Sequence, residues 1–403
     1  MLEISKYLKD IMEKFDIVGQ SPTGKGVTRL GYSPVEDLMH ETFKKIAEDE
    51  GLKYYRDQVG NSYAYLKDYD EYDYIGSHLD SVVEGGKFDG VLGVALGLAV
   101  LLTARDREID IPLKVIALRT EESSNFMYSM IGSKLITGNF DKSLIDELRS
   151  LDGKYLKDIF KEKGYTFDPD PISDIKNYIE VHIEQGRVLE EEGKKIGLVT
   201  TIAGSSRFLV DLRGFAEHSG ATPMNIRKDS LCAGAEIILN VEKIGKIESE
   251  TSVGTVGYIN NTPNSMNVIP RDTRLSIDFR DIDNDSMVDM KEKIKLMIKK
   301  TCQKRNVKYE LTEFPISPIA KMNEDGIKAL EEIAKEKNIS YKLMHSGAGH
   351  DAMIFSKIVD TNMIFIPCYK GISHNSNEKA DLDDAALGGE ILLEYLERIN
   401  YVN

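Results

Sequence analysis

The sequence predicts an α/β fold, with a central mixed sheet covered by helices on both faces and a second domain inserted into the first. Short apolar strands alternate with helices at the start of the chain, and this pattern returns after about residue 316. Between them the order of elements changes to βαββαβ, the split βαβ or ferredoxin-like arrangement. We therefore expect residues 1–206 and 316–403 to form one domain and residues 207–315 to form the inserted domain. A length of 403 residues agrees with two domains.

The first part of the chain begins with two helices and a hairpin. Apolar residues recur at helical spacing over residues 3–15. Ser33 suits a helix N-cap, Pro34 its first turn and Gly51 its end. The elements expected after this helix are strands at Tyr54–Val59 and Ser62–Leu66 around a Gly60-Asn61 turn, a strand at Tyr72–Ser77, an apolar helix at Val91–Leu102, a buried strand at Leu113–Leu118, a charged and loop-rich surface excursion with weak helices over residues 139–175, and an alternating strand at Tyr178–Gly186.

The inserted domain and the final segment complete the pattern. The elements expected in the insertion are strands at Arg207–Leu212, Ser252–Ile259, Arg274–Arg280 and Lys308–Thr312, with helices at Asp229–Ile244 and Asp285–Lys304. A helix near residues 324–337, a loop at Ser346–Asp351 and an apolar strand at Asn362–Pro367 follow, before a closing helix.

Composition and charge narrow the class of protein. The net charge of −15 argues against a nucleic-acid partner, because phosphate binding needs a basic face. Three scattered cysteines without CxxC spacing indicate neither a disulfide framework nor a structural zinc knuckle. The first residues are amphipathic rather than a signal peptide, and no apolar run approaches the roughly 20 residues of a membrane span. We expect a cytoplasmic protein that acts on small molecules and does not associate with a membrane.

Imidazole and carboxylate side chains follow or interrupt the predicted core strands. The candidates are His78, Asp89, Glu122, His182 and His374. Such side chains bind divalent cations, and open α/β sheets place ligand sites at the carboxyl ends of their strands. One bridging carboxylate with ligands on either side would hold two metal ions about 3.5–4 Å apart. This pattern indicates a metal-dependent hydrolase.

Two further carboxylates suit supporting roles. Glu121, next to Glu122, would take a proton from the attacking water and return it to a leaving nitrogen. Asp80, two residues after His78, would orient the imidazole. Taken alone, a histidine at a strand end is more often a hydrogen-bonded structural residue, and a Glu-Glu pair is usually a solvated turn. Five coincidences in one chain favour the metal site.

Eight short motifs, in order along nearly the whole chain, resemble those of the M20-type metallohydrolases, and within them the hydantoinase/carbamoylase amidases. They are Gly76-Ser-His-Leu-Asp80, Gly86-Lys-Phe-Asp-Gly90, Glu121-Glu122, His182-Ile-Glu-Gln-Gly186, His218-Ser-Gly-Ala-Thr-Pro-Met224, Asn267-Val-Ile-Pro270, Ser346-Gly-Ala-Gly-His-Asp351 and Gly371-Ile-Ser-His374. The resemblance implies a phosphorylase/hydrolase-like catalytic domain and an inserted domain that serves as lid and dimerisation surface.

The resemblance also implies roles for individual residues. His78, Asp89 and His182 would hold one metal, and Asp89, Glu122 and His374 the other, with Asp89 bridging. Glu121 would be the general base, supported by Asp80, and His218 would stabilise the oxyanion. The residues implied to contact substrate are Asn267 and Arg280, which would grip a carboxylate, and Gln185, Gly347 and Gly349, which would line the pocket. A salt bridge within the lid is the alternative for Arg280.

The function implied is a binuclear amidohydrolase that cleaves a linear C–N bond of an ureido or amide compound bearing a carboxylate. N-carbamoyl-L-amino acids and allantoate are the expected substrates, and a homodimer through the lid is the expected assembly. The ligand set accepts Zn, Mn, Co or Ni, and the sequence does not choose among them. The alternatives are an M20 aminoacylase or dipeptidase, and a metal-stabilised binding protein without catalysis. An intact ligand set with Glu121 argues against the latter, and His182-Ile-Glu-Gln-Gly186 favours the carbamoylase branch.

Three places in the sequence depart from the family's common pattern. Ser123-Ser-Asn125 stands where Gly-Ser-Arg is common, Ser219 where Ala is usual, and Ser376 where Pro is common. None of these positions is a candidate metal ligand.

Overall fold

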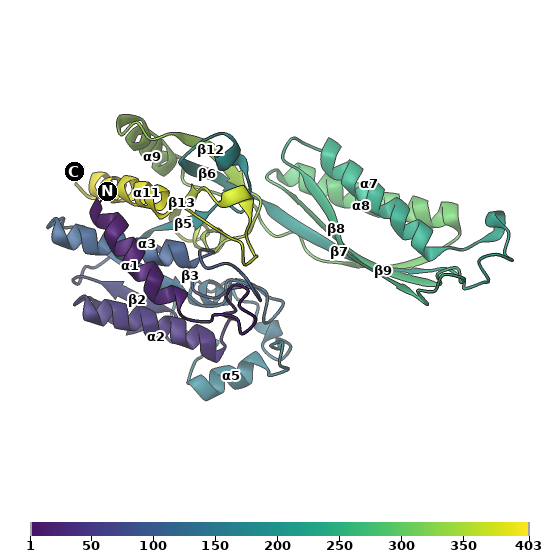
Figure 1. The fold of residues 1–403 in the computed structure, drawn as a ribbon, viewed down its shortest axis with the longest axis horizontal. Coiled ribbons are helices and arrows are strands. Elements are labelled where there is room, and N and C mark those ends of the chain that lie inside the picture. The colour runs from purple at the N-terminus through teal and green to yellow at the C-terminus, as the bar shows by residue number, and fades with distance from the viewer. Residues whose placement is uncertain (1, 402–403) are drawn as a thin grey trace. The chain divides into compact units, whose positions relative to one another are not determined.

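The computed structural model describes residues 2–401, which fall into two compact units. Unit 1 comprises Met1–Thr200 and Lys321–Asn403, and unit 2 comprises Thr201–Ala320. We expected the insertion to span residues 207–315. The predicted fold class, a mixed sheet covered by helices with a βαββαβ insertion, is confirmed (Figure 1).

The sheet of unit 1 is mixed, and its central strands are parallel. Its order is β1-β2-β4-β3-β5-β13-β6-β11, with β12 paired to β6. Neighbours among β4, β3, β5 and β13 run parallel, whereas β1, β2 and β6 pair antiparallel. The strands are β1 (Lys53–Arg56), β2 (Ser62–Tyr65), β3 (Tyr72–His78), β4 (Leu113–Leu118), β5 (Ile175–Ile183), β6 (Ile196–Ile202), β11 (Ala320–Lys321), β12 (Tyr341–Ser346) and β13 (Asp360–Ile366).

Helices cover both faces of this sheet. They are α1 (Leu2–Asp16), α2 (Pro34–Asp49), α3 (Val91–Asp106), α4 (Ile131–Ile136), α5 (Leu156–Lys163), α6 (Val188–Glu191), α9 (Glu324–Glu336), α10 (Ala352–Phe355) and α11 (Leu382–Tyr401), with short 3₁₀ turns at η1 (Lys142–Leu144) and η3 (Tyr369–Gly371). On one face α1, α3 and α11 pack together. On the other, Phe355 of α10 stacks on Tyr178 of β5, with ring centroids 4.0 Å apart.

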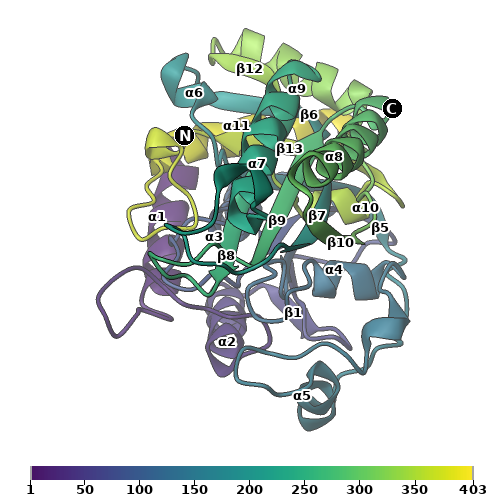
Figure 2. The same ribbon diagram turned by 90° about the vertical axis from the view of Figure 1, so that its right-hand side faces the viewer.

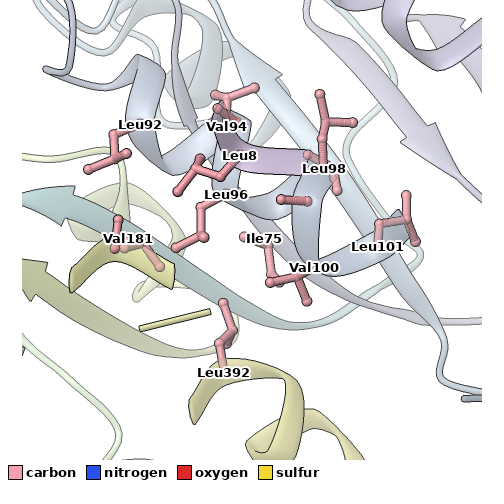
Figure 3. Close-up of a cluster of buried hydrophobic side chains, with 14 of the residues drawn as sticks. Leu8, Ile75, Leu92, Val94, Leu96, Leu98, Val100, Leu101, Val181 and Leu392 are labelled. Carbon is pink, nitrogen blue, oxygen red and sulfur yellow. The ribbon is translucent and has the colours of Figure 1, made fainter. Parts of the chain in front are cut away.

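Helix α3 is the centre of the core because it is apolar all round. Its residues from Val91 to Ala104 are buried. Figure 3 shows its leucines and valines among Leu8 of α1, Ile75 of β3, Val181 of β5 and Leu392 of α11. An interior helix of this kind packs closely on the strands that carry the candidate ligands, so it fixes their positions.

Strand β5 divides its side chains between the two faces, as the predicted alternation requires. Ile179, Val181 and Ile183 join the core around α3. Glu180 points to the other face, where its carboxylate accepts hydrogen bonds from the Ser77 hydroxyl and the Ala352 amide. His182 therefore also lies on the face away from α3.

Unit 2 is a four-stranded antiparallel sheet with two long helices on one face (Figure 2). Its sheet order is β10-β7-β9-β8. The elements are β7 (Gly204–Arg213), η2 (Met224–Ile226), α7 (Ser230–Ile247), β8 (Val253–Thr262), β9 (Asp272–Asp281), α8 (Asn284–Arg305) and β10 (Lys308–Glu313). Its own core includes Phe208, Ile237, Phe279 and Ile294, so it is a domain with a separate interior.

Several elements differ from the sequence-based expectation. The predicted strand Tyr54–Val59 ends at Arg56, because the Asp57 carboxylate accepts the amides of Val59 and Asn61 and turns the chain. Strands β6, β11 and β12 were not predicted, although Ile196–Ile202 is rich in β-branched residues. In the 139–175 excursion, by contrast, the prediction of weak helices is confirmed by the short helix α5. Within residues 2–401, no helix combines the length and the apolar character needed to cross a membrane.

The close packing of α3 on β5 can be tested with two glycines of the same helix. An added Cβ at Gly93 would lie 2.1 Å from the Val181 carbonyl oxygen, whereas at Gly97 it would meet only side-chain carbons at 3.0 and 3.1 Å. Both substitutions gain the same helix propensity, so packing decides the difference. We expect Gly93→Ala to lower the free energy of unfolding by roughly 1–3 kcal/mol more than Gly97→Ala, measured by urea denaturation. Equal stabilities would contradict the proposed close contact.

Candidate metal centre

The parallel strands deliver the candidate ligands to one edge of the sheet. His78 is the last residue of β3 and pairs in register with Leu118 at the end of β4, just before Glu121 and Glu122. His182 lies near the end of β5, beside β3. Asp89 precedes α3, and His374 lies on the loop that follows β13. The carboxyl ends of parallel strands meet at one edge, which explains how residues far apart in sequence converge.

The Asp89 carboxylate is the meeting point of three imidazoles. Its Oδ1 lies 3.0 Å from Nε2 of His182 and 3.5 Å from Nε2 of His78. Its Oδ2 lies 3.3 Å from Nε2 of His374, which is also 3.2 Å from Oε1 of Glu122. Two sets of ligand atoms therefore form, His78–Asp89–His182 and Asp89–Glu122–His374, each with its atoms within 4.8 Å of one another. Asp89 is common to both.

The hydrogen bonds of the histidines suit a cation. Nδ1 of His182 lies 2.9 Å from the Ile183 carbonyl oxygen, to which it donates, and the Gly90 amide donates to Nε2 of the same ring at 3.2 Å. Nε2 is then unprotonated and presents a lone pair. His78 likewise has Nδ1 3.1 Å from the Asp80 carbonyl oxygen. Lone pairs and a carboxylate directed at one another favour a positive charge between them, so the donor set fits divalent metals.

Without a metal, protons would fill the same role. Asp89 and Glu122 raise the pKa of His374 to about 11. Burial works against protonation of His78, but the carboxylates around it still raise its pKa well above the usual value. The site therefore attracts positive charge strongly.

Asp80 supports two parts of the site at once. Its Oδ1 lies 3.3 Å from Nδ1 of His78. The same oxygen accepts the amide of Glu121, and Oδ2 accepts the amide of Glu122, both at 3.0 Å. Asp80 thus contacts the imidazole and also holds the main chain of both neighbouring glutamates.

A second buried carboxylate, that of Glu36, fixes the main chain at Thr120, directly before Glu121. Thr120 adopts a left-handed φ of 54°, unusual for a residue with a branched side chain. Its amide donates to Oε1 of Glu36 at 2.9 Å, while Arg119 donates to Oε2 of Glu36 at 2.8 Å. Both charged residues are fully buried. The strained residue immediately before Glu121 is therefore fixed by an interior ion pair.

Glu121 lies beside the ligands without belonging to either set. Its Oε2 is 3.9 Å from Nε2 of His78. Burial raises the pKa of Glu121 well above its usual value, with Glu122 and Asp351 adding to the rise and His78 opposing it. A carboxyl group with a raised pKa is suited to accept and return a proton.

Gln185 connects the ligand cluster to a cavity. Its Nε2 donates to Oδ2 of Asp89 at 3.0 Å and lies 3.3 Å from Nε2 of His374. A cavity of about 540 Å³ opens beside it, lined by Gln185, Phe365 and the segment Lys342–Ala348, which includes Gly347. Gly349 is not among the lining residues. The structure therefore brings Gln185 and Gly347 to one cavity.

The candidates in unit 2 lie on or near paired segments of that unit. His218 forms a β-bridge with Val268, beside Asn267, and the Ser219 amide donates to the Asn267 carbonyl oxygen. The Gly220 amide donates to Nδ1 of His218 at 3.1 Å, which leaves the proton of the neutral ring on Nε2. Arg280 donates from Nε to Asp278 at 2.8 Å, so it takes part in a salt bridge within unit 2.

Asn125, where the family pattern differs, has a structural role. It is 6% exposed, its Nδ2 donates to the Gly31 carbonyl oxygen, and its Oδ1 accepts the Leu151 amide. Both ends of the side chain are thus used to join two loops.

Sequence reasoning missed residues that act on these groups through hydrogen bonds. Ser373 donates to Oδ2 of Asp89 at 2.7 Å, and its position directly before His374 was the available signal. From the sequence, Gly90 is expected only as the last residue of the Gly86–Gly90 motif, with no role of its own. An added Cβ there would lie 2.4 Å from the His78 ring, which explains the glycine in physical terms.

Comparison with known proteins assigns the chain to a family. Residues 74–398 match peptidase family M20/M25/M40. The chain is 35% identical to allantoate amidohydrolase of Escherichia coli (strain K12), with 93% of each chain covered. It is 34% identical to N-carbamoyl-L-amino acid amidohydrolase of Geobacillus stearothermophilus, again over 93% of each chain, and 35% identical to ureidoglycolate hydrolase of Arabidopsis thaliana, over 93% of this chain and 82% of that one.

A solved structure agrees with these relatives. An amidase of the hydantoinase/carbamoylase family from Burkholderia multivorans superposes with a TM-score of 0.89 at 29% identity, with 97% of each chain covered. The chain therefore belongs to the M20/M25/M40 peptidase family, as an amidase of the hydantoinase/carbamoylase group. It is a hydrolase of carbon–nitrogen bonds other than peptide bonds.

Gly90 gives a test of the metal centre with a matched control. Gly90 (φ +69°) faces His78, whereas Gly164, which ends α5, has a similar φ of +72° and open space around it. We expect Gly90→Ala to displace the imidazole and weaken metal binding by at least about tenfold, measured by titrating metal into the metal-free protein. Gly164→Ala should cost about 1 kcal/mol of stability and leave metal affinity unchanged. Unchanged affinity in Gly90→Ala would contradict the role of His78 as a ligand.

Proposed function

We propose that this amidase is a binuclear metal-dependent enzyme that cleaves the linear C–N bond of an N-carbamoyl-L-amino acid or of allantoate. The observation that carries the proposal is the pair of ligand sets sharing Asp89, with Glu121 beside them. The names of the relatives support the substrate class.

His78, Asp89 and His182 would hold one metal ion, and Asp89, Glu122 and His374 the other. Zn, Mn, Co or Ni would each suit imidazole and carboxylate ligands. When bound, the metals would supply Lewis-acid polarisation of the carbonyl and lower the pKa of water. Asp80 would keep His78 in position and fix the main chain of Glu121 and Glu122.

Glu121 would act as general base and then as general acid. Its carboxylate would take the proton of the attacking water and deliver it to the leaving nitrogen. On an N-carbamoyl amino acid, water adds to the ureido carbon, the C–N bond to the amino acid breaks, and the carbamate decomposes to carbon dioxide and ammonia.

Further residues would bind the substrate. Gln185 and Gly347, which line the cavity of about 540 Å³, would line the substrate pocket. His218 would donate a hydrogen bond from Nε2 to the oxyanion. This role is supported by the hydrogen bond that its Nδ1 accepts from the Gly220 amide. Asn267 and Arg280 would bind the substrate carboxylate. To do so, Arg280 would leave its salt bridge with Asp278 and form one with the substrate.

A homodimer through the inserted domain is part of the proposal, with residues 207–315 acting as lid and dimerisation surface. Support comes from β8, which is an edge strand of the unit 2 sheet and exposes Val253, Tyr258 and Ile259. An edge strand with exposed apolar side chains favours pairing with another chain.

The neighbouring glutamates allow the role of Glu121 to be separated from that of a ligand. We expect Glu121→Gln to reduce kcat by about 10²–10⁴-fold because the proton acceptor is lost, with metal content unchanged. Glu122→Gln should instead reduce metal content, measured by elemental analysis after dialysis. If Glu121→Gln kept full turnover, Glu121 would not be the base.

The substrate class can be tested by ammonia release. We expect the metal-loaded protein to release ammonia from N-carbamoyl-L-amino acids or allantoate, and to stop when a chelator removes the metal. 3-Ureidopropionate belongs in the same panel, and N-acetyl amino acids and dipeptides serve as controls followed by amine release. Turnover of the controls alone would contradict the proposed substrate and indicate an aminoacylase or dipeptidase.

A further inference from the structure

Glu378 is a buried carboxylate outside the proposed ligand sets, on the loop that carries His374. It is 4% exposed. Its Oε1 accepts two main-chain amides, from Phe88 at 2.8 Å and from Asp89 at 3.1 Å. The side chain therefore reaches from the loop after β13 to the backbone of the residue shared by both ligand sets.

The second oxygen of Glu378 extends the contact to the Asp89 side chain. Oε2 lies 3.2 Å from the Ser373 hydroxyl, which is also 2.7 Å from Oδ2 of Asp89. The shorter distance identifies the Asp89 carboxylate as the main acceptor of the Ser373 proton. Main chain and carboxylate of Asp89 are thus both linked to one loop.

The protein leaves room for this carboxylate. An added Cβ at Gly86 would lie 2.1 Å from the carboxyl carbon of Glu378. Gly86 does not adopt a left-handed φ, so alanine is compatible with its backbone. A glycine at this position keeps the space that the Glu378 carboxyl group occupies.

The loop that carries His374 depends on the contacts of Glu378, because the His374 side chain is not fixed by burial. The His374 side chain is 48% exposed, against 2% or less for His78 and His182. Its φ of 54° is left-handed. The base of the loop is closed by a β-bridge between Cys368 and Ala380. His78 and His182 belong to buried strands and do not depend on this loop.

We infer that Glu378 is a positioning residue that ties the His374 loop to Asp89 and so sets the affinity of the Asp89–Glu122–His374 metal site. This inference rests on the proposed binuclear function. It predicts an asymmetric defect, in which one metal is lost and the other is kept.

The test is a metal titration of purified, metal-free full-length protein with Mn²⁺ or Zn²⁺, followed by calorimetry and elemental analysis. Wild type should bind two ions per chain. Glu378→Ala should weaken one of the two by roughly 10–100-fold, the effect expected for residues that orient ligands. Glu378→Gln keeps an oxygen for the Phe88 and Asp89 amides, so its affinity should stay within a few-fold of wild type.

Two further variants separate positioning from stability. Gly86→Ala leaves Glu378 intact but displaces its carboxyl group, so it should reproduce the loss of one metal. Asp281→Ala is the matched control, because Asp281 is equally buried and accepts hydrogen bonds from Ser249, Thr251 and Ser286, but within unit 2. It should lower the melting temperature without changing metal affinity.

The outcomes are distinct. Two ions in wild type and selective weakening of one in Glu378→Ala and Gly86→Ala support the inference. Two ions with wild-type affinity in both variants overturn it and leave the proposed function standing, as does an equal loss at both sites that follows melting temperature. Fewer than two ions in wild type would count against the binuclear proposal itself.

Discussion

The convergence of three imidazoles on the buried Asp89 carboxylate is the constraint on which the rest of this site depends. A carboxylate that is removed from water needs compensating positive charge or donors. Here the Gln185 side-chain amide and the Ser373 hydroxyl provide part of that compensation. A positive charge between Asp89 and the histidines, whose Nε2 atoms lie 3.0–3.5 Å from its carboxylate, would meet the remaining demand. The packing of α3, the order of the parallel strands and the glycine at position 90 all serve to bring these groups together.

The supporting groups act mainly on main-chain atoms. Asp80 accepts the amides of Glu121 and Glu122, and Glu36 accepts the amide of Thr120. A side chain that holds a backbone fixes where the next side chain begins, and it does so without competing for the ligand atoms. This arrangement explains how the adjacent residues Glu121 and Glu122 can direct their carboxylates to different histidines, His78 and His374.

The sequence was sufficient to predict the strands that end in His78 and His182, because apolar runs and strict alternation are local signals. It also predicted the order of elements in the insertion. It could not reveal that Asp80 holds a turn forty-one residues away, or that Glu378 meets the amide of Phe88 across a separation of 290 residues. Such contacts depend on the folded arrangement and leave no periodic trace. Strand β12 was missed for a related reason, since its pairing with β6 is what makes Tyr341–Ser346 extended.

The way the insertion leaves and rejoins the sheet explains how this architecture accommodates a second domain. Strands β6 and β11, which flank unit 2 in sequence, are neighbours in the sheet, and the Met322 amide donates to the Thr200 carbonyl oxygen at 3.0 Å. In the sheet of unit 1, the entire insertion therefore occupies the place of a connection between two adjacent strands. Because the entropy of closing a loop grows only slowly with its length, exchanging a short turn for a whole domain is thermodynamically inexpensive there. A sheet of this strand order can thus carry a whole second domain without any change in how its strands pair, because only the connection between two adjacent strands differs.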